Sequence, residues 1–451
     1  AQQRDDSGIP KVHDHMFPSA NTAIPVMVDM PNAEETIAKH QEFLEGVMRL
    51  DLFGLKKGGR IDGELIAPLR PAQPELEPGE AYLLEAVLRT VKMGHIFTQG
   101  TSDSNQVWME VTATCGDEII GHSGEMDEEG LVDPWSHFVN SFVLDRDGNR
   151  IARRNAQDIF TPLYNNQIPP GAADVIHYRF TVPEDCEGPV TIHATLKYRK
   201  FDTEFMRFVN DDSEWVNDLP VTTLAEDTVV LPVAGGLPVE PMEAVAVPEW
   251  QRWNDYGIGL FRKGDLGELR GAEEAFQQVE SLGRSEGPIN LTRVYLKEGR
   301  VTEDAPAALA RAAEMIHEAR EWHLLWFGGQ VDKQNGRLDE AISKFRQVIE
   351  GGFEQAKGRG FDFSLDWRVL NELGNTLYQR ARQERGPARR ERREQLMMEA
   401  AELFHETLAL DPENADAHYN LKQIWADLEK PDDSRYHAEA HATYKVDDNA
   451  R

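Results

Sequence analysis

The sequence changes its hydrophobic period once, and this change divides the chain. Up to about residue 233, short runs rich in Val, Ile, Thr and aromatic residues alternate with turn clusters, which is typical of β-strands. Over residues 249–445 apolar residues recur every three or four positions, which is typical of amphipathic helices. The segment 234–248, with Gly235, Gly236 and several prolines, lies between the two and indicates a linker.

The helical part contains a recurring pair of one small and one large residue. Within Gly336–Phe345, the small Ala341 allows two helices to approach and Phe345 fills the gap beside it. This spacing matches the second helix of a tetratricopeptide repeat (TPR) unit, and Ala400–Leu408 gives a second match. Residues 249–445 are therefore predicted to form an α-helical TPR-type solenoid of four to five units.

The part of the chain before the linker is predicted to be rich in strands. Residues 78–233 contain several short strand-like runs, which favour an immunoglobulin-like antiparallel β-sandwich. Cys115 and Cys186 lie there and leave two alternatives open: one disulfide, worth roughly 4 kcal/mol on the chain-entropy model, or two free buried thiols. Residues 1–77 are predicted to be an irregular segment with one short helix and one strand. The expected fold class is thus multidomain β plus α.

The charge excludes some functions. The chain has 79 acidic and 48 basic residues, which gives a net charge of −31. Binding to nucleic acid requires a basic surface, so a nucleic-acid partner is not expected. An acidic surface attracts basic proteins instead. Since no run of 18 apolar residues occurs, no membrane span is predicted.

Several segments resemble those of a known family. The stretch Gly94–Asn105 reads G-H-I-F-T-Q-G-T-S-D-S-N. Further matching segments are His13–Pro25, Asn155–Tyr164, Ile168–Ala172, Asp174–Arg179 and Tyr198–Phe201. Together they resemble the non-haem region of large multihaem c-type cytochromes that also carry TPR repeats, over most of residues 11–233. One departure is clear: this chain has no Cys-x-x-Cys-His motif, so the covalent haems of the family are not expected here.

The resemblance implies a location and a set of partners. It implies a bacterial protein exported to the periplasm or outside the cell, with a c-type cytochrome or a sister subunit as its partner. Any haem c would be held by that partner or by an upstream region. His13 and His15 are then candidate axial ligands, because imidazole binds haem iron; the alternative is a simple surface pair.

Other side chains suggest a metal site in the strand-rich part. His95, His122 and His137 occur in turns, and together with Asp103 they are a donor set that suits a transition metal. The alternative is structural, with these side chains holding loops through hydrogen bonds. No phosphate-binding loop and no nucleophile motif occurs, so no catalytic residue is predicted.

The concave face of a TPR solenoid is a surface for binding peptides, formed by the first helix of each unit. Amide, basic and aromatic side chains are expected on this face. They are Asn290, Arg293, Trp322, Asn371, Asn375, Asn420 and Lys422. The alternative is that this face packs against the chain's own β domain or a sister subunit.

Three functions follow from these observations. The first is a non-catalytic, exported scaffold that docks within a multihaem cytochrome electron-transfer system. The second is a metal-dependent enzyme that uses the histidine and aspartate loops of the β domain. A protein without stoichiometric metal, whose His95→Ala variant loses no activity, would exclude it. The third is a TPR adaptor that binds a peptide unrelated to haem.

Overall fold

The computed structural model describes residues 18–97, 104–315 and 320–445. It divides the chain into two compact units: unit 1 ends at Arg262 and unit 2 begins at Lys263. Strands belong to unit 1, whereas unit 2 is helical, so the predicted order of a β-rich part and a helical part is confirmed. Within the described residues, no helix combines the length and the apolar character that a membrane span requires.

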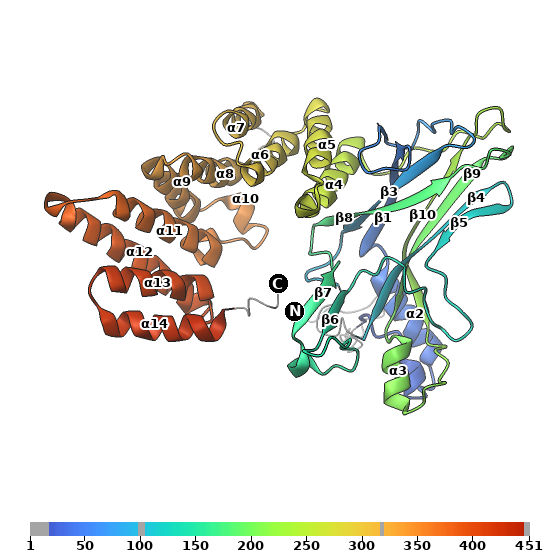
Figure 1. Cartoon of the computed structure of the whole chain (residues 1–451), viewed down its shortest axis with the longest axis horizontal. Coiled ribbons are helices and arrows are strands. Elements are labelled where there is room, and N and C mark those ends of the chain that lie inside the picture. The colour runs from blue at the N-terminus through green and yellow to red at the C-terminus, as the bar shows by residue number, and fades with distance from the viewer. Residues whose placement is uncertain (1–17, 98–103, 316–319, 446–451) are drawn as a thin grey trace, which may run out of the picture. The chain divides into compact units, whose positions relative to one another are not determined.

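Unit 1 is built around two four-stranded antiparallel sheets (Figure 1). The first has the order β2 (Leu65–Ile66), β1 (Met48–Lys57), β3 (Ala81–Thr90) and β8 (Ala173–Thr181). The second has the order β10 (Val221–Leu231), β9 (Val190–Arg199), β4 (Gln106–Cys115) and β5 (Glu118–Ser123). A separate hairpin pairs β6 (Ser141–Leu144) with β7 (Thr161–Asn165).

One hydrophobic core joins the two sheets. Alternate residues of β4, from Val107 to Ala113, belong to this core, as the two-residue period of a strand requires. Leu84 and Leu88 of β3 belong to the same core from the other sheet. Two antiparallel sheets that share a core form a β-sandwich. The immunoglobulin-like assignment within that class stays a prediction.

The outer face of the first sheet is covered by helix α4 (Glu249–Arg262), which packs on β8, β3 and β1. The approach is close: a Cβ atom added at Gly259 would lie 3.0 Å from backbone atoms of β8. The rings of Trp253 and Tyr256 lie 4.8 and 4.7 Å from the ring of Phe53 on β1. Strand β1 is therefore buried on both faces.

This helix changes the boundary between the two parts. The sequence grouped α4 with the helical repeats because its apolar period is the same, whereas the structure assigns it to unit 1. The predicted irregular segment also contributes to the sandwich, since β1 pairs with β3. The described part of unit 1 also contains the shorter helices α1 (Ile24–Met27), α2 (Ala33–Leu44) and α3 (Thr203–Asn210) and the 3-10 helix η1 (Ala156–Asp158).

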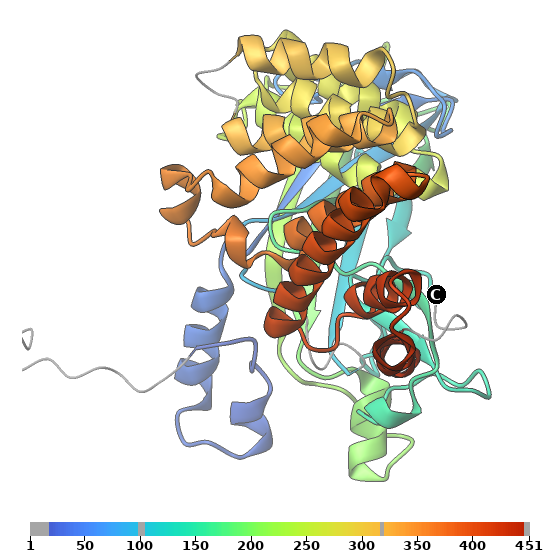
Figure 2. The same ribbon diagram turned by 90° about the vertical axis from the view of Figure 1, so that its left-hand side faces the viewer.

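Unit 2 consists of helices that pack in consecutive pairs (Figure 2). After α5 (Leu269–Ser281), the pairs are α6 (Glu286–Glu298) with α7 (Asp304–Glu314), α8 (Glu321–Gln334) with α9 (Leu338–Glu350), α11 (Trp367–Gln383) with α12 (Arg390–Leu410), and α13 (Ala415–Asp427) with α14 (Pro431–Tyr444). The helical repeats that the sequence predicts are thus present.

Small residues set the distance between paired helices. A Cβ added at Gly329 of α8 would lie 2.5 Å from the ring of Phe345 on α9. In the next pair, a Cβ added at Gly374 of α11 would lie 2.9 Å from the ring of Phe404 on α12. Both rings are fully buried. This small-and-large packing is the one that defines TPR-type helix pairs.

An insertion separates two of these pairs. Between α9 and α11 the chain forms the short helix α10 (Glu354–Lys357) and the 3-10 turn η3 (Phe363–Leu365) before α11 begins. Asp366 caps α11 by accepting a hydrogen bond from the backbone N–H of Arg368 at 3.0 Å. The insertion, residues 351–366, positions the candidate site described next.

Candidate functional site

A cavity of about 410 Å³ lies beside the first turns of α8 in unit 2. Its walls come from α8, from the insertion and from the start of α11. The apolar part of the lining is Trp322, Trp326, Val348, Ala356, Phe361, Phe363 and Val369. Its polar part is Arg320, His323, Arg359, Asp366 and Arg368. We refer to this cavity as the α8 pocket.

The aromatic walls of the α8 pocket are supported from behind. The ring of Trp322 lies 5.6 Å from that of Phe353 and 6.1 Å from that of Phe363. Trp326 lies 5.5 Å from the buried ring of Phe345. Phe361 is 57% exposed, unusually high for a phenylalanine, and lies at the mouth of the pocket. Rigid aromatic walls and one exposed aromatic ring are typical of a binding site.

The charge around the α8 pocket differs from that of the whole protein. The lining contains three arginines, Arg320, Arg359 and Arg368. It contains one carboxylate, that of Asp366, which already caps α11. The Arg320 guanidinium lies 5.5 Å from the ring centre of Trp322. A pocket with a positive surplus in a protein of net charge −31 selects for anionic groups.

His323 adds a neutral polar group to the wall. Burial lowers the pKa of His323, and the nearby Arg293 guanidinium lowers it further. The imidazole is therefore uncharged at neutral pH. It contributes a donor or an acceptor to the pocket without adding to its charge.

One residue predicted for the concave face lines this pocket, namely Trp322. Asn290 and Asn371 are buried and engaged elsewhere: Asn290 accepts a hydrogen bond from Arg293 at 2.9 Å, and Asn371 donates one to Asn414 at 3.1 Å.

The remaining predicted residues also lie outside the pocket. Asn420 donates to the carbonyl of Asp416 in its own helix at 2.8 Å. The Lys422 ammonium lies 5.7 Å from the ring centre of Tyr419. Asn375 is half-buried on α11.

The aromatic run from residue 322 to 327 was the sequence signal for the pocket. Apolar residues occur there on all sides of the helix. Packing against the paired helix covers only one of these sides, so an apolar side remains that can line a pocket. The contribution of the insertion had no such signal, because its Gly- and Phe-rich sequence indicates a loop without indicating where the loop packs.

The histidines of the β-rich unit have separate partners. His122 lies 3.3 Å from a carboxylate oxygen of Glu110, and His137 lies 3.6 Å from one of Asp174. His95 is exposed, and its Nδ1 lies 3.0 Å from the carbonyl oxygen of Ile96. No group of three or more His, Cys, Asp or Glu residues in the described parts of the chain is arranged to hold a metal ion. Asp103, His13 and His15 lie outside the described residues.

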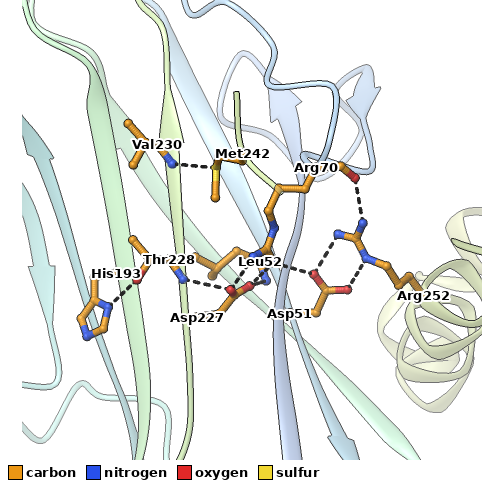
Figure 3. Close-up of polar contacts among 9 residues, drawn as sticks. All are labelled: Asp51, Leu52, Arg70, His193, Asp227, Thr228, Val230, Met242 and Arg252. Atoms are coloured by element: carbon orange, nitrogen blue, oxygen red, sulfur yellow. Dashed lines mark hydrogen bonds and ion pairs between the residues drawn. The ribbon is translucent and has the colours of Figure 1, made fainter. Parts of the chain in front are cut away.

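A buried ion network joins α4 to the sandwich (Figure 3). Arg252 of α4 binds Asp51 of β1 with two hydrogen bonds of 2.8 and 2.9 Å. Arg70 binds Asp227 of β10, which also accepts from the backbone N–H of Leu52 at 2.8 Å. Burial raises the pKa of Asp227, and Arg70 opposes that shift. Each carboxylate already has a cation and further donors, so the network is structural.

The two cysteines form a disulfide in the structure, with their Cα atoms 5.9 Å apart. Cys115 ends β4, and Cys186 lies in the connection that precedes β9. The bond therefore ties one strand of the second sheet to the loop that crosses over from the first sheet.

No family model and no curated protein matches this chain. Among solved structures, the chain is similar to MamA of AMB-1, with 16% identity and a TM-score of 0.31 over 44% of this chain and 98% of that one. It is also similar to YrrB, described as a TPR protein with an unusual peptide-binding site, with 15% identity and a TM-score of 0.32 over 44% of this chain and 87% of that one. It is similar as well to pilF of Pseudomonas aeruginosa, with 13% identity and a TM-score of 0.34 over 44% of this chain and 78% of that one. At these values the similarity says nothing of what this chain binds.

Proposed function

We propose that the helical unit binds an extended segment of a partner protein, and that one apolar side chain of this segment enters the α8 pocket. An acidic residue or the terminal carboxylate next to it pairs with Arg320, Arg359 or Arg368. The observation that supports this proposal most directly is the combination of an apolar cavity with a surplus of arginine. Helical-repeat surfaces bind extended peptides in this manner.

The size of the pocket suits one large side chain. Burying an aromatic side chain removes about 200 Å² of apolar area from water, which contributes about 5 kcal/mol before the costs of association. Each exposed ion pair adds about 1 kcal/mol or less. The gross gain of about 8 kcal/mol would correspond to micromolar affinity only if binding had no cost. Because association and the ordering of the peptide do cost free energy, a single anchor supports affinities of about millimolar strength.

A peptide display experiment on the full chain tests this function. Selected peptides are expected to share an aromatic or large aliphatic residue beside an acidic one, and to quench the fluorescence of Trp322 and Trp326. Arg359→Glu is expected to weaken binding about tenfold, because it reverses a charge at the pocket. Arg270→Glu, the same change at a 90% exposed side chain of α5, is the matched control. Selected peptides without an acidic residue, or equal losses in both variants, would contradict the proposal.

We also propose that the protein acts in an oxidising compartment outside the cytoplasm and that its partner is a c-type cytochrome. The disulfide supports the compartment, because structural disulfides persist where thiols are not kept reduced. The acidic surface suits a basic cytochrome, which in turn holds the haem. A purified basic cytochrome is expected to bind in a salt-dependent way. Binding that is insensitive to salt, or absent at low salt, would contradict this partner.

A further inference from the structure

A second cavity of about 410 Å³ lies in unit 1, at the end of the sandwich where β4 begins. The hairpin β6–β7 forms one wall, and the start of α3 forms another. Apolar side chains at its mouth are exposed: Leu131 is 40% exposed and Leu163 is 63% exposed. Phe142 also lines the cavity. We refer to this cavity as the hairpin cavity; its walls suit an aliphatic chain.

One polar atom in the lining of the hairpin cavity has no hydrogen-bond partner among the described residues. Asn140 lines the cavity and is only 4% exposed. Its Oδ1 atom is buried, and none of the described residues donates a hydrogen bond to it. A buried acceptor without a donor costs about 1–3 kcal/mol. A ligand that donates an N–H at this position would remove that cost.

The lining of the hairpin cavity contains more carboxylates than cations. Arg150 donates to Asp202 at 2.7 Å and to Glu204 at 2.7 Å, so one guanidinium faces two carboxylates. Asp202 is buried, whereas the Glu204 side chain is 51% exposed and accessible to a ligand. These three groups carry a net negative charge, which a cationic ligand would neutralise.

The loop at the rim of the hairpin cavity is also negatively charged. The loop at residues 124–134 provides Leu131 to the mouth, and it contains five acidic and no basic residues. Glu125 and Glu129 of this loop are 75% and 60% exposed, and Glu129 forms an ion pair with Arg207 at 2.9 Å. A negative rim raises the local concentration of cationic groups and speeds their association.

We propose that the hairpin cavity receives a lysine or arginine side chain of a partner protein. The aliphatic stem packs between Leu131, Leu163 and Phe142, as long basic side chains do on apolar walls. The N–H groups at its end donate to Asn140 Oδ1 and to the Glu204 carboxylate. This site belongs to unit 1, and it does not depend on the function proposed for the α8 pocket.

Methyl NMR on the full-length protein tests the proposal directly, because Leu131 and Leu163 report from the mouth of the cavity. The probes are three capped tripeptides: Gly-Lys-Gly, Gly-Arg-Gly and, as the neutral isostere, Gly-norleucine-Gly. The basic peptides are expected to shift both methyl signals in a saturable way, with at least fivefold higher affinity than the norleucine peptide. Equal affinity for all three peptides, or no saturable shift with the basic ones, overturns the proposal.

Variants then separate the two contacts. Glu204→Gln is expected to weaken binding of the lysine peptide about fivefold. Glu118→Gln, at the far end of the β4–β5 hairpin, is the matched control and is expected to have no effect. Asn140→Leu is expected to abolish binding and at the same time to raise the melting temperature, because it removes the buried unpaired oxygen. Full binding by both Glu204→Gln and Asn140→Leu overturns the proposal.

Discussion

Two adjacent glycines in α8 provide a sharp test of the helix-pair packing. Both Gly328 and Gly329 are buried, but they face different neighbours. A Cβ at Gly329 would lie 2.5 to 2.9 Å from three carbon atoms of the Phe345 ring, which is itself fully buried. A Cβ at Gly328 would lie 3.3 Å from Cδ of Lys344, whose flexible side chain is able to move away.

The two substitutions are therefore expected to have opposite effects. Replacing a helical Gly by Ala adds about 1 kcal/mol of stability through helix propensity. At Gly328 this gain is retained. At Gly329 it is outweighed by overpacking against Phe345, which costs about 1–3 kcal/mol. The two variants therefore differ by the overpacking cost of about 1–3 kcal/mol. Since 1 kcal/mol corresponds to roughly 2–4 °C for a unit of this size, their melting temperatures differ by about 2–12 °C.

The measurement is thermal unfolding of each full-length variant, followed by the helical circular dichroism signal. Gly328→Ala is expected to melt at or above the temperature of the unaltered protein, and Gly329→Ala several degrees below it. Adding Phe345→Leu to Gly329→Ala makes room for the new methyl group, so the double variant recovers part of the loss. Equal melting temperatures for the two alanine variants would refute the close packing of α8 on α9.

Three further predictions concern stability. Reduction of the disulfide between Cys115 and Cys186 lowers the stability of unit 1 by about 4 kcal/mol, as judged from denaturant unfolding with and without reductant; the sulfurs close a loop of 71 residues. Arg252→Ala leaves the Asp51 carboxylate without its main cation and costs about 3 kcal/mol, a loss that an unchanged denaturant midpoint would contradict. Burial lowers the pKa of His437 to about 4, so the stability that this group contributes is complete above pH 6.5 and decreases as the pH falls towards 4. After allowance for solvent screening, the loss is about 2 kcal/mol, and unfolding at a series of pH values is expected to show a smaller loss in His437→Phe than in the unaltered protein. A part of the loss remains in the variant because burial also lowers the pKa of His405.

Much of the fold was predictable because it follows from local periods. The spacing of Ala341 and Phe345 predicted a helix pair, and alternation along β4 predicted a strand. The placement of α4 was not predictable: its period shows which face is apolar but not whether that face meets another helix or a sheet. Contacts between residues far apart in sequence, such as that of Trp253 with Phe53, assign it to unit 1.

The candidate sites were less predictable, for a related reason. Trp322 was identified because a helical aromatic residue on the first helix of a pair is expected at the binding face. The insertion that completes the pocket has no period, so Phe361 and Phe363 gave no signal. Asn140 lies within a strand-like run in the sequence, residues 138–144, and only the structure shows that its oxygen has no donor among the described residues.

Helix α4 determines where this protein can be cut. A protein fragment designed from the linker, ending at Pro248, would lose the helix and uncover Phe53 and the charge of Asp51. Such a fragment is expected to aggregate during expression, whereas one extended to Arg262 stays in solution. If the two parts are exchanged between proteins, by recombination or in the laboratory, the junction therefore belongs after Arg262. It does not belong at the glycine pair that marks the linker in the sequence.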